Sequence, residues 1–136
     1  MNGMPGSAPD DPKARLLIVD DEPQIRSALV RALNLMGYQA EGAGSGYEAL
    51  NLLADQAYDL MLLDLHLPGI DGITVMKRAR LVHPNLMIVI LTGRPSVESA
   101  MAAVKLRAAD YLIKPVSVNE IVAAIRQTLQ ERTRQL

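Results

Sequence analysis

The sequence predicts an α/β domain: a five-stranded parallel sheet, doubly wound, with helices on both of its faces. Short apolar runs alternate along the chain with longer segments in which apolar residues recur at helical spacing. Most of these runs lack the alternation with polar residues that a solvent-exposed sheet face produces, so their strands are expected to be buried on both sides. Strands of this kind, separated by helices, form a parallel sheet between two helical layers.

The five predicted strands are short runs of strand-forming residues. Their sequences are RLLIVD (15–20), YQAEGA (38–43), DLMLLD (59–64), LMIVIL (86–91) and DYLI (110–113). Residues 1–14 precede them and are rich in Gly, Pro, Ser, Asn and Asp, so we expect a disordered N-terminal arm there. The folded domain is predicted to cover residues 15–133, with residues 134–136 as a tail or the start of a linker.

Five helices are predicted to follow the strands, with recognisable residues at their ends. They span about 23–36, 45–54, 72–82, 96–106 and 117–133. Pro23 lies in the first turn of the first helix, and Gly37 lies just past its end. A serine three residues before a glutamate, the spacing of a capping box, opens the second and the last helix: Ser45 with Glu48, and Ser117 with Glu120. Asp71 is placed to cap the third helix.

Composition limits the classes of function. The 136 residues are enough for one domain, and without cysteine the chain has neither a disulfide framework nor a thiolate metal site. The formal net charge of −1 and the mixing of acids and bases leave no wide basic field for nucleic acid. No apolar run is long enough to span a bilayer, and the first residues lack the pattern of a secretory signal. We therefore expect a soluble cytoplasmic protein that binds neither nucleic acid nor membranes directly.

Polar side chains stand at the carboxyl ends of four predicted strands, where open α/β sheets bind their ligands. Asp20 and Asp21 end the first strand, Asp64 ends the third, Thr92 follows the fourth and Lys114 follows the fifth. Each residue alone could be a helix cap, a turn residue or a surface lysine. Independent caps, however, do not require a lysine beside three carboxylates. The group as a whole therefore indicates a binding site.

The chemistry of this group favours a divalent cation and phosphorus. Crowded carboxylates repel one another and raise one another's pKa, unless a cation lies between them. Mg²⁺ prefers such oxygen ligands and commonly bridges to phosphate. Next to the ion, Asp64 could act as a nucleophile towards phosphorus, while Lys114 and Thr92 would meet the phosphoryl oxygens.

These residues lie in motifs that resemble a known family. The segments VDDEP, LLDLHLPGIDG, ILTG and DYLIKP, in this order and at these distances, resemble the receiver (CheY-like) domain of two-component response regulators. The resemblance covers about residues 15–133 and implies the flavodoxin-like strand order 2-1-3-4-5. It also implies a regulatory domain rather than an enzyme, which accepts a phosphoryl group on Asp64 from a sensor kinase's phosphohistidine or from a His phosphotransfer protein.

By the same resemblance, Mg²⁺ (or Mn²⁺) is the required cofactor. Asp21 and Asp64 would be direct ligands of the ion, with the backbone carbonyl of His66 as a third ligand. Asp20 would act largely through a bound water molecule.

The resemblance further implies a switch. Lys114 would pair with the phosphoryl charge, and Thr92 would hydrogen-bond a phosphoryl oxygen after its hydroxyl moves inward. Tyr111, which matches the family's switch aromatic but could also be a plain core residue, would turn inward behind it. The Lys114–Pro115 bond is expected to be cis. The predicted output face is formed by the fourth helix, the fifth strand and the fifth helix, and would bind a downstream effector or, on activation, a second copy.

Four positions are particular to this chain. His66 and Arg94 stand where the family sets the lifetime of the phosphoryl group, although His66 could equally be an exposed loop residue that contributes only its carbonyl. Where the family often has Gly-Ala before the fifth strand, this chain has Arg107 and Ala108, which makes a tight turn less assured.

The sequence also has features of three other classes of function. A phosphohydrolase with Asp64 as nucleophile typically needs a second acid two residues later, where this chain has His66. The segment GAGSG (42–46) superficially resembles a dinucleotide loop but lacks the spacing of that fingerprint. A receiver that serves only as a protein-binding scaffold is a third possibility, and the chain could be a stand-alone receiver or a piece of a longer regulator or hybrid kinase.

Overall fold

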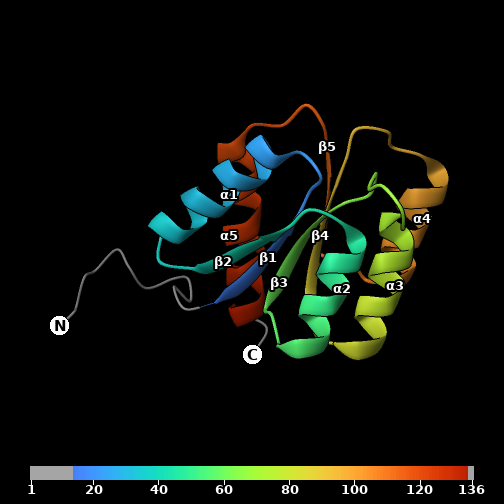
Figure 1. Cartoon of the computed structure of the whole chain (residues 1–136), viewed down its shortest axis with the longest axis horizontal. Helices are drawn as coiled ribbons and strands as arrows, with labels where there is room; N and C mark the ends of the chain where they lie inside the picture. The colour runs from blue at the N-terminus through green and yellow to red at the C-terminus, as the bar shows by residue number, and fades with distance from the viewer. Residues whose placement is uncertain (1–13, 135–136) are drawn as a thin grey trace.

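The computed structural model describes residues 14–134 and has helices on both faces of a single sheet (Figure 1). The strands are β1 (Arg15–Val19), β2 (Gln39–Ala43), β3 (Leu60–Asp64), β4 (Met87–Thr92) and β5 (Asp110–Ile113). The helices are α1 (Pro23–Leu35), α2 (Gly46–Asp55), α3 (Gly72–Val82), α4 (Val97–Lys105) and α5 (Val118–Arg134). The predicted alternation of strands and helices is confirmed. The predicted arm falls outside the described residues except for Ala14, and the predicted tail except for Arg134.

The sheet has the order β2-β1-β3-β4-β5, and every pair of neighbouring strands is parallel. Figure 1 shows α1 and α5 on one face and α2, α3 and α4 on the other. Both features confirm the predicted fold class. Among the helices formed by residues 14–134, none combines the length and apolar character of a membrane span.

The apolar runs of the inner strands are explained by the two helical layers. Leu16 and Ile18 of β1 pack in the core beneath α1 and α5, whereas Leu17 and Val19 pack in the core beneath α2 and α3. Because successive strand residues point to opposite faces, an inner strand needs apolar residues at every position. The edge strand β2 has only Ala43 buried, which accounts for its mixed sequence.

Most of the predicted helix caps form. The Asp71 side chain accepts a hydrogen bond from the Thr74 backbone nitrogen at 2.9 Å. Ser117 and Glu120 form a reciprocal capping box: the Ser117 hydroxyl accepts from the Glu120 nitrogen, and the Glu120 carboxylate accepts from the Ser117 nitrogen.

The capping box predicted at the start of α2 forms only in part. The Ser45 hydroxyl accepts from the Glu48 nitrogen at 3.1 Å, as expected. The Glu48 carboxylate, however, accepts from the backbone nitrogen of Gly44 at 2.7 Å and so bonds one residue before the predicted partner. The glutamate therefore stabilises the loop after β2 as well as the helix.

The turn before β5 is tight even though glycine is absent from it. Arg107 has a φ of 60°, in the left-handed region that usually favours glycine. Its backbone nitrogen donates to the Val104 carbonyl, and that of Ala108 donates to the Ala103 carbonyl, which is the hydrogen-bond pattern of a Schellman motif. The Arg80 guanidinium of α3 donates to the Leu106 carbonyl at 3.1 Å and holds this turn from outside.

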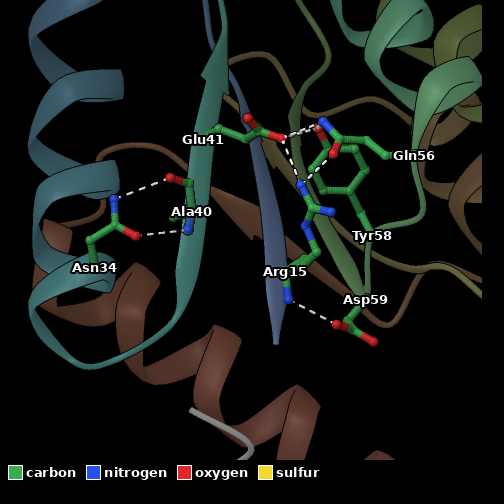
Figure 2. Close-up of polar contacts among 7 residues, drawn as sticks. All are labelled: Arg15, Asn34, Ala40, Glu41, Gln56, Tyr58 and Asp59. Atoms are coloured by element: carbon green, nitrogen blue, oxygen red, sulfur yellow. Dashed lines mark hydrogen bonds and ion pairs between the residues drawn. The ribbon is translucent and has the colours of Figure 1, made fainter. Parts of the chain in front are cut away.

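Polar side chains form a closed group at the amino end of the sheet, which we call the amino-end network (Figure 2). Its central members are Arg15, Glu41, Gln56 and Tyr58. Three of their donors converge on one carboxylate oxygen, Oε1 of Glu41: the Arg15 guanidinium at 3.5 Å, the Gln56 amide at 2.9 Å and the Tyr58 hydroxyl. The Arg15 guanidinium also donates to Gln56, whose amide donates to the Tyr58 oxygen at 2.8 Å. Burial, together with the Glu41 charge and hydrogen bond, raises the pKa of Tyr58 to about 12.

Asp59 extends the amino-end network to α5. One carboxylate oxygen accepts from the Arg15 backbone nitrogen at 2.8 Å, and the other pairs with the Arg132 guanidinium at 3.2 Å. These contacts connect β1, the segment before β3 and the last helix.

Candidate functional site

The predicted site residues gather at the carboxyl end of the sheet. Asp20 and Asp21 follow β1 directly, Asp64 and Thr92 are the last residues of β3 and β4, and Lys114 follows β5 directly. Because β1, β3, β4 and β5 are consecutive neighbours in the sheet, these ends lie side by side. The strand order thus brings together residues that are up to 94 positions apart, from 20 to 114.

Asp20, Asp21 and Asp64 form what we call the acid cluster. Each offers one carboxylate oxygen, and these oxygens all lie within 4.8 Å of one another. Asp20 and Asp64 are buried, whereas Asp21 is exposed. The cluster is thus closed on the protein side and open to solvent at Asp21.

The Asp20 carboxylate is only partly satisfied by the protein. Its Oδ1 accepts from the Glu22 nitrogen at 2.8 Å, but its Oδ2 is one of two buried side-chain atoms without a hydrogen-bond partner within residues 14–134. Burial raises the pKa of Asp20 above its usual value, the Glu22 hydrogen bond opposes this rise, and the charge of Asp64 adds to it. A buried acceptor in this state favours a cation as its partner.

Within residues 14–134, Lys114 supplies the one ammonium group that contacts the acid cluster. Its Nζ donates to Asp64 Oδ2 at 2.9 Å and lies 3.6 Å from Glu22 Oε1 and 4.0 Å from Asp20 Oδ2. Burial by itself would lower the pKa of the Lys114 ammonium, but the hydrogen bond to Asp64 and the three acidic charges outweigh it and raise that pKa. The lysine therefore stays charged and offsets part of the negative charge.

The donor set of the acid cluster fits Mg²⁺. Three carboxylates with one side open to solvent match an ion that takes oxygen ligands and keeps several waters. Mn²⁺ accepts the same ligand type. The unpartnered Asp20 oxygen is the observation that a bound cation would explain.

Thr92 is fully buried and its hydroxyl is already engaged. The Thr92 Oγ1 accepts from the Arg94 nitrogen at 3.0 Å and lies 3.1 Å from His66 Nε2. His66 is exposed, yet its imidazole reaches this hydroxyl, and its backbone nitrogen donates to Asp64 Oδ1 at 2.9 Å. The histidine therefore contacts both the third and the fourth strand ends.

Tyr111 lies half-buried on β5 and is bonded to α4. Its hydroxyl is 2.6 Å from the hydroxyl of Ser99, a buried residue that forms a reciprocal capping box with Ser96 at the start of α4. The Lys114–Pro115 peptide bond is cis, as expected. Sequence reasoning missed Ser99; the Ser-x-x-Ser spacing at the start of the fourth predicted helix was the available signal.

Comparison with known proteins places this geometry in a family. The family model for the response regulator receiver domain matches residues 16–126. The chain belongs to this family. It is a receiver domain of two-component response regulators, and receiver domains are regulatory domains. The resemblance of the four sequence motifs to receiver domains is thereby confirmed.

Named relatives agree with this assignment. Response regulator MprA of Mycolicibacterium vanbaalenii is 39% identical over 119 residues, which are 88% of this chain and 52% of MprA. The chain thus spans about half the length of the curated relatives it matches.

Two solved structures are informative about ligands. A response regulator from Burkholderia pseudomallei, solved with a phosphorylated aspartic acid, calcium ion and citrate, has a TM-score of 0.76 and 31% identity, covering 90% of this chain and 72% of that one. TrrA of Thermotoga maritima, solved in complex with Mg(2+)-BeF, has a TM-score of 0.75 and 33% identity, covering 85% of this chain and 99% of that one. The Burkholderia protein thus carries a phosphorylated aspartate with a calcium ion, and TrrA carries Mg²⁺.

Proposed function

We propose that this receiver domain, with residues 15–133 as its boundaries, accepts a phosphoryl group on Asp64 and uses Mg²⁺ or Mn²⁺ at the acid cluster. The proposal rests on the groups that surround Asp64. The residue is 3% exposed, and its carboxylate is bonded to the Lys114 ammonium at 2.9 Å and lies within 4.8 Å of two further carboxylates. The phosphorylated aspartic acid in the Burkholderia relative supports the same reading.

The donor in this proposal is a phosphohistidine of a sensor kinase or of a His phosphotransfer protein. An Asp64 oxygen attacks the phosphorus, a P–O bond forms while the P–N bond breaks, and the histidine nitrogen leaves with the bonding electron pair. The product on Asp64 is an acyl phosphate. Lys114 offsets the charge of the phosphoryl oxygens. When bound, Mg²⁺ supplies further charge neutralisation for the carboxylates and these oxygens.

We propose Asp21, Asp64 and the His66 backbone carbonyl as direct ligands, with Asp20 acting through water. The burial of Asp20 and the exposure of Asp21 support this division, because the exposed acid can turn freely towards the ion. The hydrogen bond from the His66 nitrogen to Asp64 holds the loop that carries the proposed carbonyl ligand close to the cluster.

The proposed switch starts at Thr92. The phosphoryl group carries about −1.5 to −2 charge units, which replace the single negative charge of the Asp64 carboxylate. To reach a phosphoryl oxygen, the Thr92 hydroxyl exchanges its contact with the His66 imidazole for the new acceptor. Tyr111 then moves behind it, and because its hydroxyl bonds Ser99, this movement acts on the start of α4.

The proposed output face is the α4-β5-α5 surface. Met101 and Val104 of α4 and Ile113 of β5 are exposed apolar side chains, and Val104 lines a surface hollow together with Tyr111. Such groups are suited to bind a downstream effector domain or protein, or a second copy on activation. His66 and Arg94, which both contact Thr92, are proposed to set the lifetime of the phosphoryl group.

Intact-mass spectrometry tests the proposal. The protein is incubated with Mg²⁺ and a small phosphodonor such as acetyl phosphate, and compared with Asp64→Asn and with a sample containing a chelator. We expect one labile phosphoryl adduct on the parent chain, and none on the variant or without the metal. An adduct that persists on Asp64→Asn would disprove the assignment of Asp64. A folded parent that takes no adduct and binds no Mg²⁺ would favour a protein-binding scaffold.

A further inference from the structure

Gly42 of β2 and Gly44 just after the strand make room for one arginine side chain. A Cβ on Gly42 would lie 2.9 Å from Arg26 Cγ and 3.0 Å from Cδ, and a Cβ on Gly44 would lie 3.1 Å from Arg26 Nη1. Neither glycine has the left-handed backbone that would require glycine for another reason. The Arg26 side chain of α1 therefore lies against the end of β2, at a distance that only glycine allows at Gly42.

The guanidinium ends at the backbone of the acid cluster. Arg26 Nη1 donates to the Asp20 carbonyl oxygen at 2.7 Å. Asp20 makes two further hydrogen bonds. Its backbone nitrogen donates to the Ala43 carbonyl at 3.1 Å, and its carboxylate accepts from the Glu22 nitrogen at 2.8 Å. Arg26 thus bonds the third polar group of this residue, namely the carbonyl of the peptide that joins Asp20 to Asp21.

We infer that Arg26 is a positioning residue for the divalent-cation site, which acts through the Asp20–Asp21 peptide. This inference rests on the proposed function, since it assumes Mg²⁺ at the acid cluster. The orientation of that peptide sets the directions in which two of the three carboxylates leave the backbone. Outer partners that orient metal ligands contribute substantially to metal affinity.

Whether removal of the Arg26 side chain weakens or strengthens Mg²⁺ binding shows if the arginine acts through positioning or through its charge. A guanidinium near the cluster repels a cation, so its removal would tighten Mg²⁺ binding if charge were its main contribution. If positioning dominates, removal weakens binding instead. Lysine keeps the charge and can donate one hydrogen bond from a more flexible side chain, so Arg26→Lys is expected to restore part of the affinity.

The test is isothermal titration of the whole chain with Mg²⁺. Arg26→Ala is expected to raise the Kd by about tenfold, and Arg26→Lys to recover part of that loss. Gly42→Ala is expected to weaken binding as well, because its new Cβ displaces the Arg26 side chain. In the double variant Arg26→Ala with Gly42→Ala, the second change should add nothing, since the side chain that it displaces is gone.

Controls keep the outcomes distinct. Arg31→Ala removes the same charge from an exposed position on α1 and should leave the Kd unchanged. Circular dichroism and urea unfolding with a chelator establish that each variant is folded; should Arg26→Ala not fold, Gly42→Ala and Arg26→Lys carry the test. A parent chain that binds no Mg²⁺ overturns the proposed function. A parent that binds, with folded Arg26 and Gly42 variants that bind equally well or better, overturns this inference alone.

Discussion

The two ends of the sheet both gather charged side chains, but they balance them differently. In the amino-end network three donors converge on one oxygen of Glu41, and every central member is bonded to another (Figure 2). In the acid cluster, as far as the described part of the chain shows, three carboxylates share one ammonium, that of Lys114, and an oxygen of Asp20 has no hydrogen-bond partner. In the amino-end network donors and acceptors largely match, whereas the acid cluster has an excess of negative charge.

This difference distinguishes a structural polar group from a binding site. A partly buried network whose members satisfy one another stabilises one conformation, whereas an excess of buried acid is costly unless a ligand completes it. Among the described residues, the amino-end network also has one unpartnered buried atom, Arg15 Nε. There, however, the guanidinium carbon lies 5.4 Å from the centroid of the Tyr58 ring, and a cation–π contact compensates in part.

Asp20→Asn is expected to have the largest effect, because it removes an acid from the cluster. The Mg²⁺ affinity should fall by about tenfold or more. The free energy of unfolding without metal should rise by about 1 kcal/mol, since a buried charge is replaced by a neutral amide of the same shape. Titration calorimetry and urea unfolding with a chelator measure the two quantities. Unchanged Mg²⁺ affinity, or a less stable metal-free variant, would contradict the comparison.

Glu41→Ala is the matching change at the other end. It leaves the donors of Arg15, Gln56 and Tyr58 without their shared acceptor, so the free energy of unfolding should fall by about 1–3 kcal/mol. The Mg²⁺ affinity should stay as in the parent, because the acid cluster lies at the opposite end of the strands. Urea unfolding and calorimetry test both statements, with Glu41→Gln as the milder control that keeps an acceptor oxygen. A clear loss of Mg²⁺ affinity would show that the two ends are coupled.

Tyr58→Phe should change how stability depends on pH. The pKa of Tyr58 is about 12 in the folded chain and about 10 when unfolded, so the folded state holds the proton more tightly. This contribution to stability is complete below about pH 10 and is lost as the pH rises to about 12. The stability difference between parent and Tyr58→Phe, about 1 kcal/mol near neutral pH, should therefore shrink across this range. Urea unfolding at several alkaline pH values measures it, and a constant difference would refute the assignment.

Asn34→Ala is expected to have the smallest effect on stability. It measures what side-chain hydrogen bonds contribute at an exposed position. The Asn34 amide accepts from the Ala40 nitrogen at 2.8 Å and donates to the Ala40 carbonyl at 3.1 Å, on the exposed side of α1 and β2 (Figure 2). The free energy of unfolding should fall by less than about 1 kcal/mol. A loss as large as that of Glu41→Ala in the same unfolding measurement would mean that burial does not decide these energies.

The sequence by itself determined the fold class, the order of the elements and the end of the sheet that carries the acids. Apolar periodicity distinguishes buried strands from amphipathic helices, and parallel connections bring every strand's carboxyl end to the same edge. The sequence therefore predicts, without any interatomic distance, that one site contains Asp20, Asp64, Thr92 and Lys114.

Only the tertiary structure decided which side chains bond across the fold. Ser99 meets Tyr111 over a separation of 12 residues, and Arg15 meets Gln56 over 41. The space at Gly42 is filled by Arg26 of another element, and the left-handed turn at Arg107 forms with support from Arg80. These contacts depend on strand register and helix docking to within an ångström, and residue type and local periodicity carry no information at that precision.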